Sequence, residues 1–317
     1  MIVRLLDVFL TLVVPAYAIV GVGWALARAP WMPVVLLARF RRLVFDLVLP
    51  LYLVRTLAAV ELPAEPRFDY LLVYYLVTAG VYAIVAALAW RARGAGVANI
   101  LGLGAVYANA VLLGVPLVTA ALGEAAAVPL FALIALHAPL LATATGVLAE
   151  LARPERGAGG FALAREVLLG MVRNPIILGI VAGLACNLAF GPLSEPLRAR
   201  TASFSAVVPV LALLAMGVGL ATYRLRSAAG DAFLVAGAKL VLHPLVVAGA
   251  LALLPGLPAL WWQTAVLMAA MPTGVNVYLF AARQGAGEAE AAATVALATP
   301  LSMATLTLVI VLIASEA

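Results

Sequence analysis

Ten stretches of mostly apolar residues follow one another along the chain, separated by short segments that hold most of its charge. A helix needs roughly 20 apolar residues to cross a bilayer whose hydrocarbon core is about 30 Å thick. The stretches are continuous and lack the alternation of β-barrel strands. The pattern therefore predicts ten membrane-spanning helices, at about 8–27, 39–59, 70–90, 97–119, 127–150, 167–189, 203–222, 232–254, 261–283 and 290–313.

The apolar stretches of the second half match those of the first half at a spacing of about 160 residues. The pattern Ala-Leu-x-x-Pro-Leu at Ala135 recurs at Ala296, 161 residues further on (135 to 296). Pro15 in the first stretch is matched by Pro175 in the sixth, 160 residues later (15 to 175). Prolines shared between corresponding apolar segments are typical of a duplicated membrane domain, and such duplications usually build transporters.

The most polar connection lies near the middle of the chain and divides the ten spans into two sets of five. We therefore expect a first repeat at 1–151, a cytoplasmic linker at 152–166 and a second repeat at 167–317. Because five is odd, the second repeat must enter the membrane from the opposite side. The expected fold is an all-α polytopic membrane protein of two inverted five-helix repeats, the plan of bile acid symporters and sodium/proton antiporters.

Composition agrees with this interpretation. Hydrophobic residues make up 66% of the chain and charged residues 10%, with a mean hydropathy of +1.17, which excludes a soluble globular domain. The net charge of +5 is explained by loops that face anionic lipid headgroups, so no nucleic-acid partner is expected.

Arginine placement orients the chain, because basic residues in short loops stay on the cytoplasmic side. Thirteen arginines follow odd-numbered spans: Arg28, Arg39, Arg41, Arg42, Arg91, Arg93, Arg153, Arg156, Arg165, Arg173, Arg224, Arg226 and Arg283. Five lie on the other side: Arg4, Arg55, Arg67, Arg198 and Arg200. This asymmetry predicts a multi-pass protein of the cell (inner or plasma) membrane with both termini outside.

Two corresponding spans, the fourth and the ninth, carry residues that interrupt helices. Proline removes a backbone donor, glycine weakens the helix, and an unwound turn in mid-membrane exposes amides and carbonyls that can hold a polar solute. Ordinary proline kinks would be the simpler interpretation, but two matched spans that each pair a break with an asparagine favour a binding site. The candidate substrate-binding residues are Asn109, Gly114, Pro116, Pro272, Thr273, Gly274 and Asn276.

Four motifs, in this order, resemble the auxin efflux carrier (AEC, PIN-like) family in its bacterial branch: NAVLLGVP, NPIILGIVAGL, KLVLHPL and MPTGVNVYLFAARQG. The resemblance covers essentially the whole chain. It implies a scaffold domain and a mobile transport domain, an elevator-type motion, a homodimer, and a substrate, often a carboxylate, bound where the broken fourth and ninth helices cross. Asn109 and Pro116 fall on family positions, whereas Val277 stands where plant carriers have a second crossing proline, which argues against auxin itself.

Ionisable side chains within spans are expensive, and three are candidates for ion coupling or substrate charge. Asp46 could take up a proton or a cation, or be neutralised by Arg42 one turn earlier. Lys239 and His243 share one helix face, and the lysine either attracts an anion or extends to the cytoplasmic rim. The other histidine, His137, has no counterpart in the repeat and is expected to be structural.

Enzyme motifs are missing from the sequence. We find no HExxH, GxSxG or Walker A pattern and no cluster with metal-ligand spacing, so neither catalysis nor a cofactor nor a metal is expected. Without an ATP site, uphill transport must use an ion gradient or the membrane potential. The leading hypothesis is a secondary transporter for small organic anions; the alternatives are a sodium- or proton-coupled symporter or antiporter and a membrane sensor that binds its ligand without moving it.

Overall fold

A computed structural model describes residues 2–62, 67–151, 165, 168–170, 172–221 and 228–313. The expected linker at 152–166 lies outside these residues except for Arg165, and so do Arg153, Arg156, Arg224 and Arg226. Within the described residues all regular structure is helical, in agreement with the expected all-α class. Among the described residues, six helices are long and apolar enough to cross a membrane by length and composition: Val3–Arg28, Phe68–Gly104, Glu124–Ala149, Glu195–Leu220, Ala229–Ala252 and Glu288–Ile313.

The first half of the chain begins with two long helical rods and continues into a kinked helix. Gly94 has a φ of 73° and a ψ of 163°, a conformation that suits glycine, and it turns the chain within α5. The elements are α1 Ile2–Val8, η1 Phe9–Val13, α2 Val14–Arg28, α3 Val34–Leu43, η2 Val44–Val48, α4 Leu49–Ala59, α5 Phe68–Gly104, η3 Ala110–Gly114, α6 Val115–Leu122, η4 Glu124–Ala126 and α7 Ala127–Leu151.

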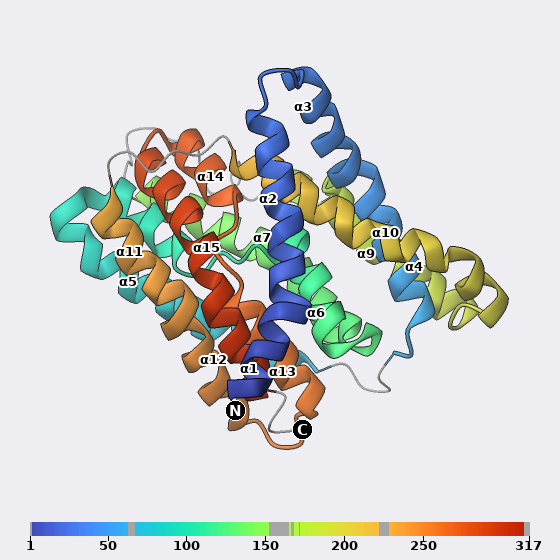
Figure 1. The fold of residues 1–317 in the computed structure, drawn as a ribbon. Coiled ribbons are helices and arrows are strands. Elements are labelled where there is room, and N and C mark those ends of the chain that lie inside the picture. The colour runs from blue at the N-terminus through green and yellow to red at the C-terminus, as the bar shows by residue number, and fades with distance from the viewer. Residues whose placement is uncertain are drawn as a thin grey trace.

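The second half contains two helices of 26 residues, α10 and α15, together with shorter helical segments. Its elements are α9 Pro175–Phe190, α10 Glu195–Leu220, α11 Ala229–Gly237, η6 Ala238–Leu242, α12 His243–Ala252, α13 Ala259–Ala270, α14 Asn276–Gln284 and α15 Glu288–Ile313. Figure 1 shows α1 beside the end of α15, so that both described ends of the chain lie at the same end of the molecule.

Four prolines inside the rods follow a π-helical turn. Pro15, Pro50, Pro116 and Pro244 each come two residues after the end of a π turn, in η1, η2, η3 and η6. A proline cannot donate to the carbonyl four residues earlier and its ring crowds that carbonyl, and a wider turn relieves the clash. These prolines therefore bend the rods without ending them.

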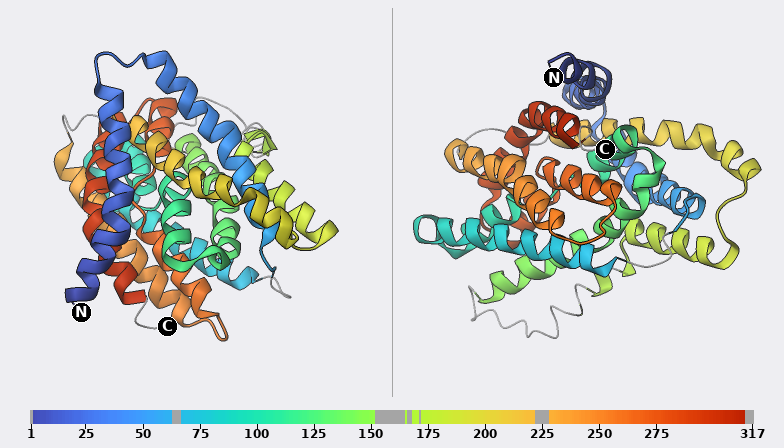
Figure 2. Two further views of the ribbon diagram at one scale, coloured as in Figure 1. Left: turned by 45° about the vertical axis from the view of Figure 1, so that its right-hand side comes forward. Right: turned by 90° about the horizontal axis from the view of Figure 1, so that it is seen from below.

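The helices form two groups. The first helix group, α2, α3, α4, α9 and α10, lies to one side of the molecule in Figures 1 and 2, and the second helix group, α5, α6, α7 and α11–α15, fills the rest. Within the first group α2 packs on α10 and α4 packs on α9. A Cβ added to Gly217 would lie 2.0 Å from the Val20 oxygen, so α10 and α2 touch backbone to backbone. Small residues of this kind are what membrane helices use to pack closely.

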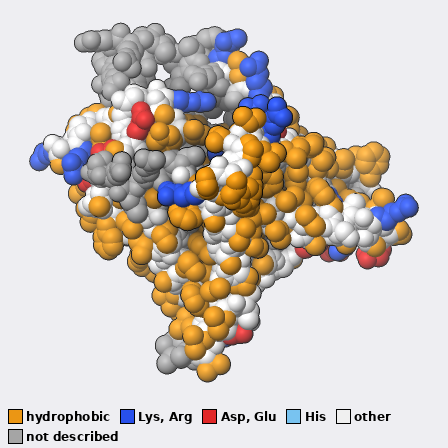
Figure 3. Space-filling model, turned by 45° about the horizontal axis from the view of Figure 1, so that its top comes forward, with side chains coloured by type: hydrophobic (Ala, Val, Ile, Leu, Met, Phe, Trp, Pro, Cys, Tyr) orange, Lys and Arg blue, Asp and Glu red, His pale blue; other side chains and the backbone are white. Residues whose placement is uncertain are grey.

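The outer surface is strongly apolar. Figure 3 shows hydrophobic side chains over most of one face, with lysine and arginine gathered toward its edges. Large side chains such as Leu188, Phe190 and Leu253 are 77%, 87% and 82% exposed. Apolar exposure on this scale is expected for a protein whose surroundings are lipid and not water. The chain is therefore a multi-pass helical membrane protein.

Candidate functional site

The centre of the second helix group is built from two interruptions that meet. Residues 105–109 separate α5 from η3, and residues 271–275 separate α13 from α14. The Asn109 N–H donates to the Pro272 oxygen at 2.8 Å, and the Gly274 N–H donates to the Tyr107 oxygen at 2.9 Å. These bonds form an isolated antiparallel bridge between Ala108 and Thr273. We call the two bridged segments, 105–109 and 271–275, the crossing. Because a buried backbone that leaves a helix must find new partners, each interruption satisfies the other.

The sequence explains the second interruption well. Pro272 disfavours a helical Met271, whose φ and ψ of −59° and 144° end α13. A Cβ on Gly274 would lie 3.0 Å from the Ala108 oxygen, so glycine permits the close approach of the two backbones. Thr273 Oγ1 donates to the Gly104 oxygen at 2.8 Å and so satisfies a carbonyl at the end of α5.

The first interruption lies earlier than the residues that predicted it. Gly114 and Pro116 both lie inside the continuous helical run of η3 and α6, after the unwound stretch at 105–109. The Gly114 N–H donates to the Asn109 oxygen at 3.0 Å, which starts this run. Pro116 is buried and is accommodated by the π turn before it. Both residues therefore shape the helix that leaves the crossing.

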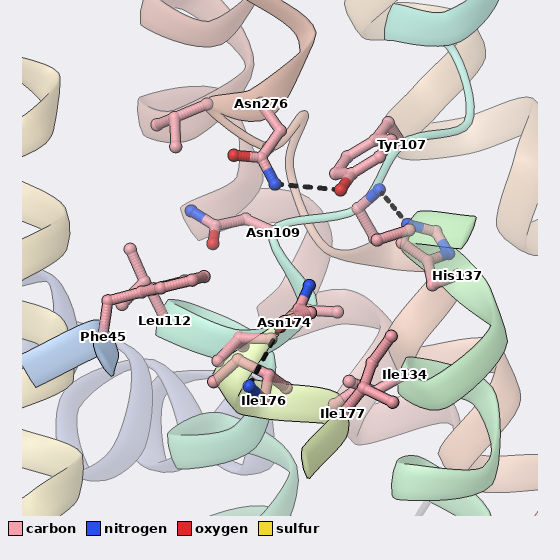
Figure 4. A pocket seen from close by; sticks show the side chains of 16 residues that line it. Phe45, Tyr107, Asn109, Leu112, Ile134, His137, Asn174, Ile176, Ile177 and Asn276 are labelled. Carbon is pink, nitrogen blue, oxygen red and sulfur yellow. Dashed lines mark hydrogen bonds between the residues drawn. The ribbon is translucent and has the colours of Figure 1, made fainter. Parts of the chain in front are cut away.

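A pocket with a cavity volume of about 70 Å³, partly open to the outside, lies beside the crossing. Its lining comes from both helix groups: η2 and the start of α9 contribute from the first, and the crossing, α7 and α14 contribute from the second. Ligand pockets in proteins combine apolar walls with a few polar groups, as this pocket does. The lining residues labelled in Figure 4 are Phe45, Tyr107, Asn109, Leu112, Ile134, His137, Asn174, Ile176, Ile177 and Asn276.

Of the predicted site residues, Asn109, Gly274 and Asn276 line the pocket. Asn109 is 6% exposed, and its side-chain Nδ2 has no hydrogen-bond partner. Asn276 Nδ2 donates to the Tyr107 hydroxyl at 2.9 Å, which fixes the amide at the pocket wall. Leaving a buried donor unsatisfied costs about 1–3 kcal/mol, so the Asn109 amide is a site at which an acceptor from a ligand would be favoured. Pro272 and Thr273 support the crossing but do not line the pocket.

His137 also lines the pocket and holds the crossing in place. Its Nε2 accepts a hydrogen bond from the Ala108 N–H at 3.0 Å, and its ring lies 4.9 Å from that of Tyr107, centroid to centroid. An accepting Nε2 carries no proton, so the ring is neutral in this arrangement. The expected structural role is consistent with this bond, but the sequence did not indicate that the same imidazole would lie at the pocket.

Asn174 is a pocket residue that sequence reasoning did not single out. Its Oδ1 accepts the Ile176 N–H at 2.9 Å, which makes it the N-cap of α9, and Pro175 occupies the first helical turn. The Asn-Pro pair before an apolar run is a recognisable helix start. It could have placed the positive end of the α9 dipole at this position. Phe45 carries no comparable signal, because its place depends on how the two helix groups pack.

Lys239 and His243 lie in the interior, outside the pocket lining. Lys239 is fully buried, and its Nζ donates to the Ala269 oxygen near the end of α13. Nζ also lies 3.4 Å from His243 Nδ1, and His243 Nε2 lies 3.1 Å from Thr78 Oγ1. One interpretation of its position expected the lysine to extend to the cytoplasmic rim, and its full burial contradicts that interpretation. The Lys239 side chain therefore supplies a donor to one of the last carbonyls of α13, which lack partners within the helix.

Asp46 lies outside both the pocket lining and the contact between Lys239 and His243. It belongs to η2 and its side chain is on the outer surface, one residue from the pocket residue Phe45. No ion pair joins it to Arg42 in the part of the chain that the structure describes. The described residues also contain no group of three or more His, Cys, Asp or Glu side chains suited to a metal ion.

A multi-pass helical protein with a pocket at two crossed, interrupted helices belongs to the class of membrane transporters, and comparisons with known proteins place it there. A family model described as "Membrane transport protein" matches residues 160–310. A Rhizobium meliloti (strain 1021) protein named "Putative malonate transporter" is 31% identical over 288 residues, which cover 86% of each chain. The chain belongs to the auxin efflux carrier (AEC, PIN-like) family and is a transporter, not an enzyme.

Proposed function

We propose that this protein is a secondary transporter for small organic anions, with carboxylates as the substrate class. The observation that carries the proposal is the unpartnered Asn109 amide in a pocket that also receives Asn174, Asn276 and the N-terminal end of α9. Amide N–H groups and a helix N-terminus are suitable donors to a carboxylate. The name of the Rhizobium relative supports the same substrate class.

The absence of acidic side chains from the pocket favours an anion over a cation. None of the lining residues that the structure describes is aspartate or glutamate, and the polar side chains among them are tyrosine, asparagine and histidine. A cation would need carboxylates or a set of converging carbonyls. The nearest acid in sequence, Asp46, has its side chain on the outer surface.

We further propose that ten spans form two inverted repeats, 1–151 and 167–317, joined by a cytoplasmic linker. The packing of the first helix group supports this: α2 of one half pairs with α10 of the other, and α4 pairs with α9 in the reciprocal combination. Reciprocal pairing of first and second helices is what a two-fold axis in the membrane plane produces. An even number of spans would also return the chain to the side of the membrane on which it began. Figure 2 shows the two described ends at the same end of the molecule, in agreement with this proposal.

An elevator-type motion fits the position of the pocket between the two helix groups. In this proposal the first helix group is the scaffold and the second helix group carries the crossing and the substrate across the membrane. The scaffold contributes Phe45 and Asn174 to one wall, and the mobile group contributes Asn109 and Asn276 to the other. Alternating access would expose this interface to each side in turn. A homodimer through the scaffold, with both termini outside the cell membrane, completes the proposal.

Ion coupling is the second candidate function, and Lys239 with His243 favours it through their burial beside the end of α13. A sodium- or proton-coupled symporter or antiporter would draw on these residues or on Asp46. Currents from proteoliposomes on solid-supported membranes, recorded with and without sodium and across pH, would decide between coupled and uncoupled transport. Responses that do not change with sodium or pH, together with unchanged radiolabel uptake, would exclude coupling.

The proposed function is tested by counterflow of radiolabelled malonate into proteoliposomes, with Asn109→Ala as the pocket variant. Asn187→Ala is a matched control, because Asn187 is an equally buried asparagine whose Nδ2 donates to the Leu57 and Val60 oxygens far from the pocket. We expect loss of counterflow for the first variant and retention of it in folded protein for the second. Wild-type protein that exchanges no carboxylate would refute the proposed function.

A further inference from the structure

We infer that the pocket binds its substrate as a monoanion, with one ionised carboxylate at the crossing and an uncharged remainder. This inference rests on the proposed function and narrows its substrate class. It predicts that monocarboxylates and half-ionised dicarboxylates are preferred over fully ionised dicarboxylates. Three observations support it: the uncharged lining, the division of the pocket into a polar and an apolar part, and the charge balance of the interior.

The lining supplies hydrogen-bond donors but no formal charge. Within the described part of the chain, its residues include no lysine, arginine, aspartate or glutamate. His137, the lining residue that could become cationic, accepts the Ala108 N–H at Nε2, and protonation of that nitrogen would break the bond. A single carboxylate can be satisfied by neutral amides and a helix N-terminus, as in many anion sites. A second carboxylate would have to be buried without a partner of opposite charge, which is far more costly.

The pocket is also divided by polarity. Figure 4 shows Asn109, Asn276 and Tyr107 on one side, and Phe45 and Leu112 on the other. Ile134, Ile176 and Ile177 extend the apolar side, while Asn174 lies between the two parts. A ligand with one carboxylate and a less polar body fits this division. A dianion would place its second charge against isoleucine, leucine and phenylalanine side chains.

The described interior contains one charged residue near the crossing. Lys239 is fully buried, whereas no aspartate or glutamate of the described residues is buried. Its Nζ contacts the Ala269 oxygen, two residues before the interruption that begins at Met271, and its other partner is an imidazole. An ammonium at Lys239 would have no carboxylate partner among the described residues, and one negative charge in the pocket would balance it. Two negative charges would leave the interior with a net charge.

The test compares malonate with monomethyl malonate, which has a single carboxyl group and is therefore a monoanion throughout the pH range of the experiment. Equilibrium dissociation constants of both are measured on purified wild-type protein by isothermal titration calorimetry between pH 5 and 8. The titratable groups that face the site are His137 and Tyr107 in the lining and Lys239 and His243 behind it. The ratio of the two constants reports the protons taken up with malonate in excess of those taken up with the ester. The same measurements on Lys239→Met and His137→Gln protein show whether that extra proton is on the protein or on malonate.

We expect the ratio of the malonate constant to the ester constant to rise about tenfold per pH unit above the second ionisation of malonate, because one proton is bound with the ligand. A ratio that stays constant or falls over this range, or a rise that is lost in either variant, would show that the dianion is bound and would overturn the inference while leaving the proposed function intact. Failure of both ligands to bind at any pH would overturn the inference and the proposed function together.

Discussion

The two helix groups solve the packing problem of a membrane interior in opposite ways. In the first helix group, helices approach until backbones touch, as at Gly217 against the Val20 oxygen. In the second, two helices stop, and their free backbone groups bond to each other between Tyr107 and Gly274 and between Asn109 and Pro272. The first arrangement tolerates no added volume, and the second leaves polar groups beside a cavity. Substitutions in the first helix group should therefore lower stability, and substitutions in the second should change substrate binding and transport.

The largest effect is expected for Asn109→Asp, which changes a neutral donor into a buried negative charge of the same size. Repulsion of a carboxylate, together with loss of a donor, should lower transport by at least about 100-fold, because truncating or reversing a buried charged contact costs about 2–5 kcal/mol. Counterflow of malonate measures this. Asn109→Asp protein that transports at the wild-type rate would place the substrate elsewhere.

The next effect is expected for Gly217→Ala in the first helix group. A Cβ at this position would lie 2.0 Å from the Val20 oxygen, so α2 and α10 must separate. We expect a loss of stability of about 1–3 kcal/mol, the usual cost of overpacking a tight interface. Thermal unfolding in detergent checks the stability, and the KM of the folded fraction should not change. A changed KM without a change in thermal unfolding would contradict the assignment of stability to the first helix group and of substrate binding to the second.

A smaller effect is expected for Asn174→Ala, because Asn174 both caps α9 and lines the pocket. Loss of the N-cap of α9 should cost about 1 kcal/mol of stability, and loss of the pocket amide should weaken substrate binding several-fold. Asn174→Ser is the matched control, because serine restores the cap and keeps a hydroxyl at the pocket. If serine recovers stability but not affinity, the amide contributes directly to binding; recovery of neither would contradict the assignment of the cap.

The smallest effect is expected for Cys186→Ala. Cys186 is exposed and is the single cysteine in the sequence, and surface substitutions usually change stability by no more than about 0.5 kcal/mol. The resulting cysteine-free chain allows the proposed orientation to be measured. A cysteine introduced at Val3, which is 81% exposed, should react with an impermeant thiol reagent added outside intact cells. Reaction only after the cells are opened would place the N-terminus inside.

Much of the fold followed from pattern alone, because apolar length and helix-breaking residues act locally. Pro272 and Gly274 marked the second interruption at its place. The first interruption was displaced from Gly114 and Pro116 to 105–109, where the sequence has neither proline nor glycine. A π turn absorbs Pro116, and the unwound stretch exists because the opposite backbone offers it partners. Such a partnership between distant segments has no local signal.

The pocket was less accessible to sequence reasoning for the same reason. Asn109 and Asn276 were identified because each lies beside a break that recurs in the repeat. His137 and Phe45 come to the pocket from elements far apart in the sequence, and nothing near them distinguishes them from packing residues. The burial of Lys239 also depended on tertiary structure, since a lysine early in a span can equally extend to the surface.

A structure determined by electron cryomicroscopy with a saturating carboxylate such as monomethyl malonate would test the proposed site most directly. We expect density for a carboxylate within hydrogen-bonding distance of Asn109 Nδ2, with the rest of the ligand against Phe45 and Leu112. Density at another location, with the crossing and its pocket unchanged and empty at the same ligand concentration, would contradict the assignment of the pocket as the substrate site.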